Sequence, residues 1–249
     1  NRIVGSTATN SVCQQVPTNN TAELVKNDQD AETIGNGIGT FYAKFPGALG
    51  NNIGITVYPA AAGSGQWGNW LSAGGFDFSA LFTNYPATSP WLLGQNDSDQ
   101  NLQKKLDEVH VVVYDAGGQI SGTKGTVLET YAFLSQAAGA KTNDGGNNFW
   151  KDVINNRSNW IRFGVLDTSK QPAWGGSITN DEVTLTGVQD YSAGITWSAT
   201  DAFRVLGGGS DGNAVGTADY VTGWEDFSDP DTTTIDLVIA PGRSDVAEQ

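Results

Sequence analysis

The sequence predicts an α/β to α+β fold, in which a mixed β-sheet carries a few helices and long loops. Short segments that alternate apolar and polar residues are separated by glycine and proline turns. Glycine supplies 32 of the 249 residues, and Asn, Thr and Asp are common, which favours turns and strands over a helical bundle. Residues 203–241 read as strand, glycine-rich turn, helix and strand, an order typical of a parallel crossover.

The N-terminal part contains two strand candidates. Arg2–Gly5 is the first, and a surface connection is expected at Cys13–Asn20 because that segment has turn residues and no periodicity. Asp30–Gly39 is interrupted by glycine and is expected to be irregular. After a turn at Pro46-Gly47, alternating apolar residues predict one apolar strand face that ends at Pro59.

An aromatic excursion follows the second strand. Residues 60–96 mix glycine and serine with many large aromatic residues, among them Trp67, Trp70, Phe76, Phe78, Phe82 and Trp91. A solvated linker does not carry so many aromatic side chains, so part of the segment is expected to pack on the body or on a partner. We therefore expect one main domain over 1–249, formed by about 1–58 and 108–249, with 59–107 as a peripheral excursion able to fold as a small lobe.

A hairpin is predicted beyond the excursion. After a short helix over Ser98–Asp107, the strand that begins near His110 turns at Gly117-Gly118 and pairs with Thr126–Ser135. Apolar residues at helical spacing predict a short helix over Asn147–Asn155.

The remaining elements complete the predicted sheet. Trp160–Val165 is a strand candidate and Val183–Val188 a weak one. In the last unit Thr217 is the expected N-cap of a helix that Asp229-Pro230 ends. The apolar segment Ile235–Ala240 is expected to be a strand buried on both faces.

The charge balance argues against some partners. The chain has 27 acidic and 13 basic residues, a formal charge of −14, and Lys104-Lys105 is its only adjacent basic pair. Direct binding to nucleic acid or to an anionic membrane is therefore not expected. No apolar run is long enough to cross a bilayer, and the single cysteine, Cys13, can form no internal disulfide.

Two motifs resemble ligand loops. Gly207–Gly212 lies between a strand and a helix, where phosphate loops occur, but no Lys-Ser/Thr pair follows and Asp211 would repel a phosphate. A turn that needs positive φ angles explains these glycines better. Spacing typical of a calcium loop is present at Asp97, Asp99, Asn101 and Glu108. Leu102 replaces the glycine that such a loop requires, so a capped helix explains these residues better.

Candidate catalytic groups have structural explanations. His110 is the only histidine and lies among valines, so strand packing or edge exposure is expected. Asp and Glu are frequent enough to form glycosidase pairs by chance, but Glu129 in a strand and Glu225-Asp226 on the polar face of a helix are expected to be solvated. Trp67 and Trp70 are the first candidates for a sugar-binding platform, with packing as the other explanation. We predict no catalytic, cofactor-binding or metal-binding residue.

Several segments together resemble one protein family. FPGALGNNIGI (Phe45–Ile55) resembles a turn-and-strand motif of the form PGxxGNxI. VLETYAFLS and the later INNRSNWI, both within Val127–Ile161, are similar to a second pair of motifs. VLGGGSDG with its helix and the strand LVIAPG resembles a third, and NRIVGSTATN resembles an N-terminal strand. In this order the segments resemble the contractile bacteriophage tail sheath proteins.

The resemblance implies a structural role. It implies the central, protease-resistant type of fragment of a sheath subunit, without the N-terminal arm and C-terminal domain. Such subunits form stacked hexameric rings around the tail tube and, on a signal from the baseplate, contract to drive the tube through the host envelope. The implied place is the virion, after synthesis in the host cytoplasm, with no cofactor or catalysis.

Two expectations complete the sequence-based account. The charge of −14 makes close packing of like chains repulsive, so this piece alone is expected to be a monomer. The alternative function is an extracellular glycan-binding β-rich module of the adhesin type.

Overall fold

The computed structural model describes residues 8–13, 24–34, 41–72, 74–94, 106–164, 203–214 and 216–225. Within these residues seven strands form a sheet in the order β5-β4-β3-β7-β1-β2-β6, and the strand pairs are antiparallel. The strands are β1 Val12–Cys13, β2 Phe41–Ala43, β3 Ile53–Pro59, β4 Glu108–Asp115, β5 Val127–Ser135, β6 Ile161–Phe163 and β7 Phe203–Gly207. The α-helices are α1 Asp28–Ile34, α2 Pro90–Leu93, α3 Trp150–Arg157 and α4 Thr217–Glu225. The predicted strand-rich fold with few helices is confirmed.

The hairpin of β4 and β5 forms as predicted. The Asp115 carboxylate, at the end of β4, accepts hydrogen bonds from the backbone N–H groups of Gly118, Ile120 and Ser121. Gly118 has φ 78°, a left-handed conformation that glycine adopts without strain. The carboxylate therefore fixes the shape of the loop that reverses the chain.

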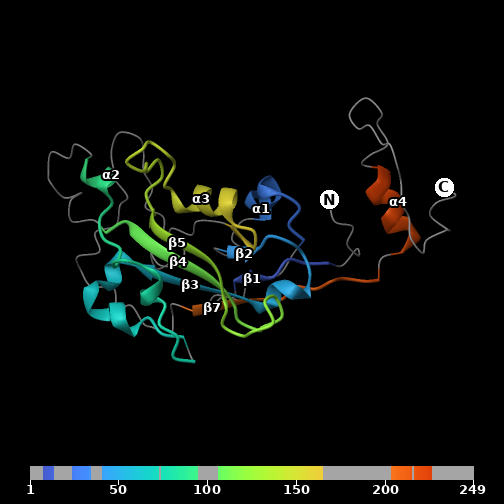
Figure 1. Cartoon of the computed structure of the whole chain (residues 1–249). Coiled ribbons are helices and arrows are strands. Elements are labelled where there is room, and N and C mark those ends of the chain that lie inside the picture. The colour runs from blue at the N-terminus through green and yellow to red at the C-terminus, as the bar shows by residue number, and fades with distance from the viewer. Residues whose placement is uncertain are drawn as a thin grey trace.

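One face of the sheet packs against α3. Buried side chains of β3 and β4, among them Ile55, Val57 and Val111, meet Trp150 and Ile154 of α3 in the main hydrophobic core. Figure 1 shows α3 and α1 on this side of the sheet. The alternation of Ile53, Ile55 and Val57 that predicted one apolar face is confirmed by their burial.

The aromatic excursion covers the opposite face of β3 and β4. Tyr58, Trp70, Phe78 and Val112 are buried together, with Trp67, Phe82 and Tyr114 packed around them. The indole Nε1 of Trp70 donates to Thr56 Oγ1 at 2.7 Å. In Figure 1 the excursion forms the cyan 3-10 turns η3 Ala60–Ala62, η4 Ser64–Asn69 and η5 Ser79–Leu81 beneath the strands. All seven residues of β3 are therefore buried.

Two predictions near the N-terminus are wrong over the residues that the structure describes. α1 occupies part of Asp30–Gly39, which was expected to be irregular. The helix is capped because Asn27 Oδ1 accepts from Asp30 N while Asp30 Oδ2 accepts from Lys26 N. Of the surface connection expected at Cys13–Asn20, only Cys13 lies among the described residues, and it belongs to β1, which pairs with β7.

The C-terminal helix begins one residue from the expected position. Tyr220 N donates to Gly216 O at 3.3 Å, so Gly216 precedes the first turn and Thr217 lies inside it. Figure 1 shows α4 set apart from the sheet at the end of an extended segment. Among the helices of the described ranges, none is long and apolar enough to cross a membrane.

Some predicted elements lie outside the described residues. They are the strands Arg2–Gly5, Val183–Val188 and Ile235–Ala240, and nearly all of the helix expected over Ser98–Asp107. The parallel crossover that Ile235–Ala240 would complete therefore remains a prediction, as does the division into a main domain and a small lobe.

Candidate functional site

Three segments that are far apart in the sequence meet beyond the ends of β3 and β7. We call this junction 1 and define it as Thr9–Ser11, Gly47–Asn52 and Gly208–Asp211. Its centre is the side chain of Asn51. The Nδ2 of Asn51 donates to Gly209 O at 2.9 Å, while Oδ1 accepts from Gly209 N at 2.8 Å and from Ser11 Oγ at 2.8 Å. One amide side chain therefore binds both of the other segments.

Backbone contacts reinforce junction 1. Thr9 and Ser210 exchange hydrogen bonds as an isolated antiparallel bridge, with Thr9 N to Ser210 O at 3.0 Å and Ser210 N to Thr9 O at 3.2 Å. Thr9 O also accepts from Gly47 N at 3.0 Å, so it binds both of the other segments. The carboxylate of Asp211 accepts from Ala48 N at 3.0 Å, at the start of the 3-10 helix η2 (Ala48–Asn52).

The glycines of junction 1 allow a close approach of backbones. A Cβ atom on Gly209 would lie 2.0 Å from Ser11 Oγ and 2.6 Å from Gly47 O, closer than atoms can pack. A Cβ atom on Gly50 would lie 2.6 Å from Ser11 Oγ. Gly208 and Gly212 have φ angles of 78° and 76°, so the prediction of a turn with positive φ angles is confirmed at these two positions.

A second junction joins β5 to the end of α3. Junction 2 consists of Lys44, Glu129 and Ser158–Ile161. The Glu129 carboxylate accepts from Ser158 Oγ at 2.6 Å and from Asn159 N at 2.7 Å. Lys44 Nζ donates to Ser158 O at 2.6 Å, just beyond the C-terminus of α3, where a cation is favoured by the helix dipole.

Ser158 also organises the entry to β6. Its Oγ accepts from Trp160 N at 3.1 Å and from Ile161 N at 2.9 Å, while Asn155 Oδ1 accepts from Phe163 N at 2.6 Å. The segment INNRSNWI therefore uses its polar side chains to turn the chain from α3 into β6. Glu129, which was expected to be solvated, is half-buried and anchors this turn to β5.

His110 lies in the interior of the sheet. It is completely buried in β4, its Nδ1 accepts from Phe133 N at 3.0 Å, and its Nε2 lies 2.9 Å from Asn84 O. Burial lowers the pKa of His110 to about 4, against a smaller opposite effect of the Asn84 hydrogen bond. The ring is therefore neutral at physiological pH and serves packing, the first of its two predicted roles.

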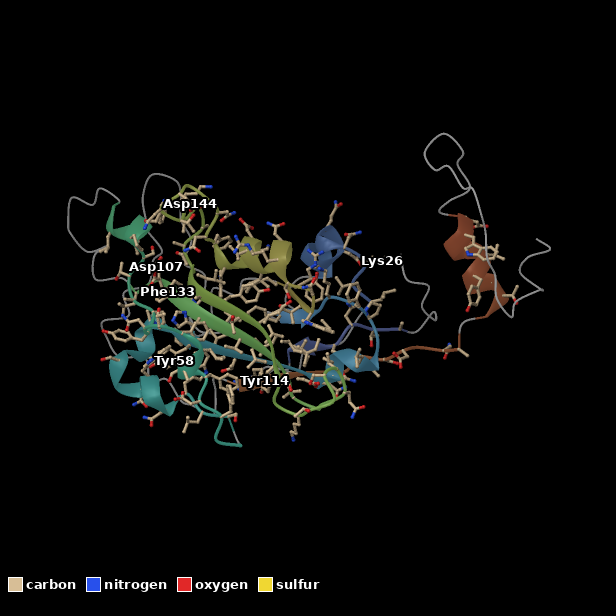
Figure 2. The ribbon with its side chains drawn as sticks, viewed as in Figure 1. Lys26, Tyr58, Asp107, Tyr114, Phe133 and Asp144 are labelled. Atoms are coloured by element: carbon tan, nitrogen blue, oxygen red, sulfur yellow. The ribbon has the colours of Figure 1, made fainter. Side chains whose placement is uncertain are left out.

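Buried carboxylates hold backbone groups. Asp107 accepts from Ser89 N and from Ser135 Oγ, and Glu108 Oε2 accepts from Ala87 N at 2.9 Å. Burial raises the pKa of Asp107 and the pKa of Glu108. Figure 2 labels Asp107 at the end of the sheet near α2, and its contacts tie the returning end of the excursion to β5.

Most of the calcium-loop candidates are not part of the described structure. Asp97, Asp99 and Asn101 lie outside the described residues, and Glu108 faces the backbone of Ala87. In the part of the chain that the structure describes, no three His, Cys, Asp or Glu side chains are grouped so that they could hold a metal ion.

The two tryptophans proposed for sugar binding are packed against other rings. Trp70 is completely buried and Trp67 contacts Tyr58, Trp70 and Phe82 with ring centroids 4.9 to 6.4 Å apart. Trp70 is closed to a sugar, and Trp67 is half-buried against these rings, so packing explains both side chains.

These contacts join distant segments of a strand-rich fold through polar side chains and backbone groups. The chain is similar to the tail sheath protein of Salmonella phage ViI, with 25% identity over 231 residues, and the match covers 64% of this chain and 36% of the relative. No family model matches the chain. The similarity supports a relation to phage tail sheath proteins.

Proposed function

We propose that this chain is a structural part of a contractile phage tail sheath subunit and catalyses no reaction. In full, the proposed subunit assembles with its copies as stacked hexameric rings around the tail tube. A signal from the baseplate makes the rings contract and drive the tube through the host envelope. The chain corresponds to the central part of such a subunit.

The observation that carries this proposal is where the junction residues lie. Thr9, Asn51 and Gly209 of junction 1 come from three of the segments that resemble sheath motifs. Glu129 and Ser158 of junction 2 come from the remaining two. The segments that resemble the family thus contact each other within each junction, which gives the resemblance a physical basis.

The junctions also suit the mechanics of contraction. A sheath shortens when whole subunits rotate relative to each other, so each subunit must keep its own shape. Thr9 Oγ1 donates to Gly208 O across 199 positions of sequence, and such contacts between distant segments resist internal deformation. The similarity to the phage ViI tail sheath protein supports the same role.

Immunogold electron microscopy of the phage that encodes this chain tests the proposal. Antibodies raised against the purified chain should label the whole length of the tail, in both extended and contracted particles. Label confined to the capsid, to the baseplate or to fibre tips would refute a sheath role. Pre-immune serum provides the control.

A further inference from the structure

The pairing of β4 with β5 is interrupted opposite His110. Val109 pairs with Leu134 and Val111 pairs with Tyr131, so the single residue His110 faces two residues of β5, Ala132 and Phe133. A bulge of this kind leaves a backbone N–H without its partner in the ladder. Phe133 has φ 53°, a left-handed conformation that is unusual for an aromatic residue.

The imidazole of His110 replaces the missing partner. Its Nδ1 accepts the hydrogen bond from Phe133 N, so Nδ1 carries no proton. The proton of the neutral ring is therefore on Nε2, which donates it to Asn84 O in the excursion. Figure 2 shows Phe133 at the same end of the sheet as Asp107. One ring thus connects β4, the bulge of β5 and the excursion.

Aromatic rings pack around the imidazole of His110. The Phe82 ring stacks on it with centroids 4.2 Å apart and an interplanar angle of 1°, while Phe133 meets it edge-on at 4.6 Å. Trp67 lies 5.6 Å away. Phe82 and Trp67 belong to the excursion, so the imidazole can reach water only if the excursion moves or the sheet opens.

We propose that His110 holds the aromatic excursion on the sheet at neutral pH. Protonation of its Nδ1 in acid releases the excursion while the sheet stays folded. A protonated Nδ1 cannot accept from Phe133 N, so the bulge loses the bond that supports its left-handed residue. The positive charge of the protonated imidazole is also costly in this buried place and is stabilised by contact with water. The sheet holds a separate core on its other face, between β3, β4 and α3, which the release of the excursion leaves in place.

The neighbouring ionisable groups do not drive this release. The side chains packed on the ring, those of Trp67, Phe82 and Phe133, carry no charge. Tyr58, the residue of β3 that pairs with His110, is also neutral, because burial raises its pKa. Asp107 and Glu108 on β4 have raised pKa values, so their protonation relieves a burial cost and opposes unfolding on acidification. The carboxylates farther along these elements are bonded elsewhere, Glu129 to Ser158 and Asp77 to Ser79. Asp115 lies at the opposite end of β4 and holds the loop between β4 and β5.

Nitrogen NMR of the untagged protein tests the proposal directly, because His110 is the only histidine. Histidine labelled with ¹⁵N should show the Nε2–H tautomer at neutral pH and protonate near pH 4. Acrylamide quenching of tryptophan fluorescence should rise about two-fold over the same pH range, while the far-ultraviolet circular dichroism of the sheet is unchanged. Protonation near the ordinary value of about 6.5 without a change in quenching would overturn the proposal.

A matched variant distinguishes release of the excursion by His110 protonation from general unfolding of the protein in acid. His110→Gln keeps an acceptor and a donor of similar reach but does not titrate, so its quenching should stay constant between pH 7 and pH 4. An equal rise in quenching in the variant would overturn the proposal. If the variant does not fold, the measurements on the wild-type protein test the proposal. Loss of the circular dichroism and the rise in quenching in one transition would then overturn the proposal.

Discussion

Asn51 and Gly209 exchange two hydrogen bonds across 158 positions of sequence, from Asn51 Nδ2 to Gly209 O at 2.9 Å and from Gly209 N to Asn51 Oδ1 at 2.8 Å. The pair lies just beyond the place where β3 and β7 begin to pair, at Gly54 and Val205. A side chain therefore extends the ladder where the backbones of the two strands separate. Because β7 joins the two halves of the sheet, this contact helps to hold the halves together.

Replacing Asn51 with Ala should lower the free energy of unfolding by about 2–3 kcal/mol, because three partly buried hydrogen bonds are lost. Urea denaturation measures this change. Asn69→Ala is the control, since the exposed Asn69 amide donates to the exposed Gln66 side chain, and it should change stability by less than about 0.5 kcal/mol. Equal stability of both variants would show that junction 1 contributes little.

Gly209→Ala should destabilise the fold by about 2–4 kcal/mol, because the added Cβ would meet Ser11 Oγ and Gly47 O. Removing one obstacle with Ser11→Gly should restore only part of the loss, since the Gly47 carbonyl remains. Gly65→Ala is the matched control because a Cβ there has no atom within 4 Å. Thermal unfolding followed by circular dichroism compares the variants, and full rescue by Ser11→Gly would contradict the geometry of junction 1.

Glu129 and Ser158 should be energetically coupled. In a double-mutant cycle with Glu129→Gln and Ser158→Ala, we expect a coupling free energy of about 1–2 kcal/mol, because the hydroxyl donates to a carboxylate at 2.6 Å. Ser158→Ala should be the more damaging single change, since Ser158 Oγ also accepts from two backbone N–H groups. Additive effects of the two changes would mean that the residues do not act together.

Asp115 should make the free energy of unfolding of the protein depend on pH. Burial by itself raises the pKa of Asp115, but hydrogen bonds from Ser121, Ile120 and Gly118 outweigh it and hold the pKa below its usual value. The folded state therefore favours the charged carboxylate, and its contribution is present above the ordinary pKa of about 3.9 and is lost as the pH falls below it.

Asp115→Asn should consequently cost about 1–3 kcal/mol at pH 7 and progressively less below pH 4. Urea denaturation at several pH values measures the difference between the variant and the wild-type protein. Asp152→Asn is the control, because its carboxylate accepts from the exposed Asn147 side chain. A cost for Asp115→Asn that does not change with pH would refute this role of the carboxylate.

Local patterns of apolar residues in the sequence predicted much of the sheet. The alternation in β3, the valines of β4 and the helical spacing in α3 all predicted elements that the structure contains. The cap of α1 was missed because the glycines of Asp30–Gly39 outweighed the pair Asn27 and Asp30, whose spacing of three residues is itself a capping signal.

Contacts between distant segments could not be predicted from one sequence. Nothing local to Asn51 indicates that its partner is Gly209, and nothing local to Glu129 indicates Ser158. The burial of His110 was one of two predicted outcomes, but the bulge at Phe133 that explains its hydrogen bond depends on strand register. In the sequence, only the resemblance to sheath motifs indicated that these segments are related to each other.

Cryo-electron microscopy of the extended and contracted tails would test the central claim most directly, that this chain is a sheath component which moves as a rigid body. We predict that the chain fits the sheath density in both states, with Asn51 opposite Gly209 each time, while its position relative to the neighbouring subunits changes. A sheath built from a different protein, or a junction 1 that opens on contraction, would contradict the account.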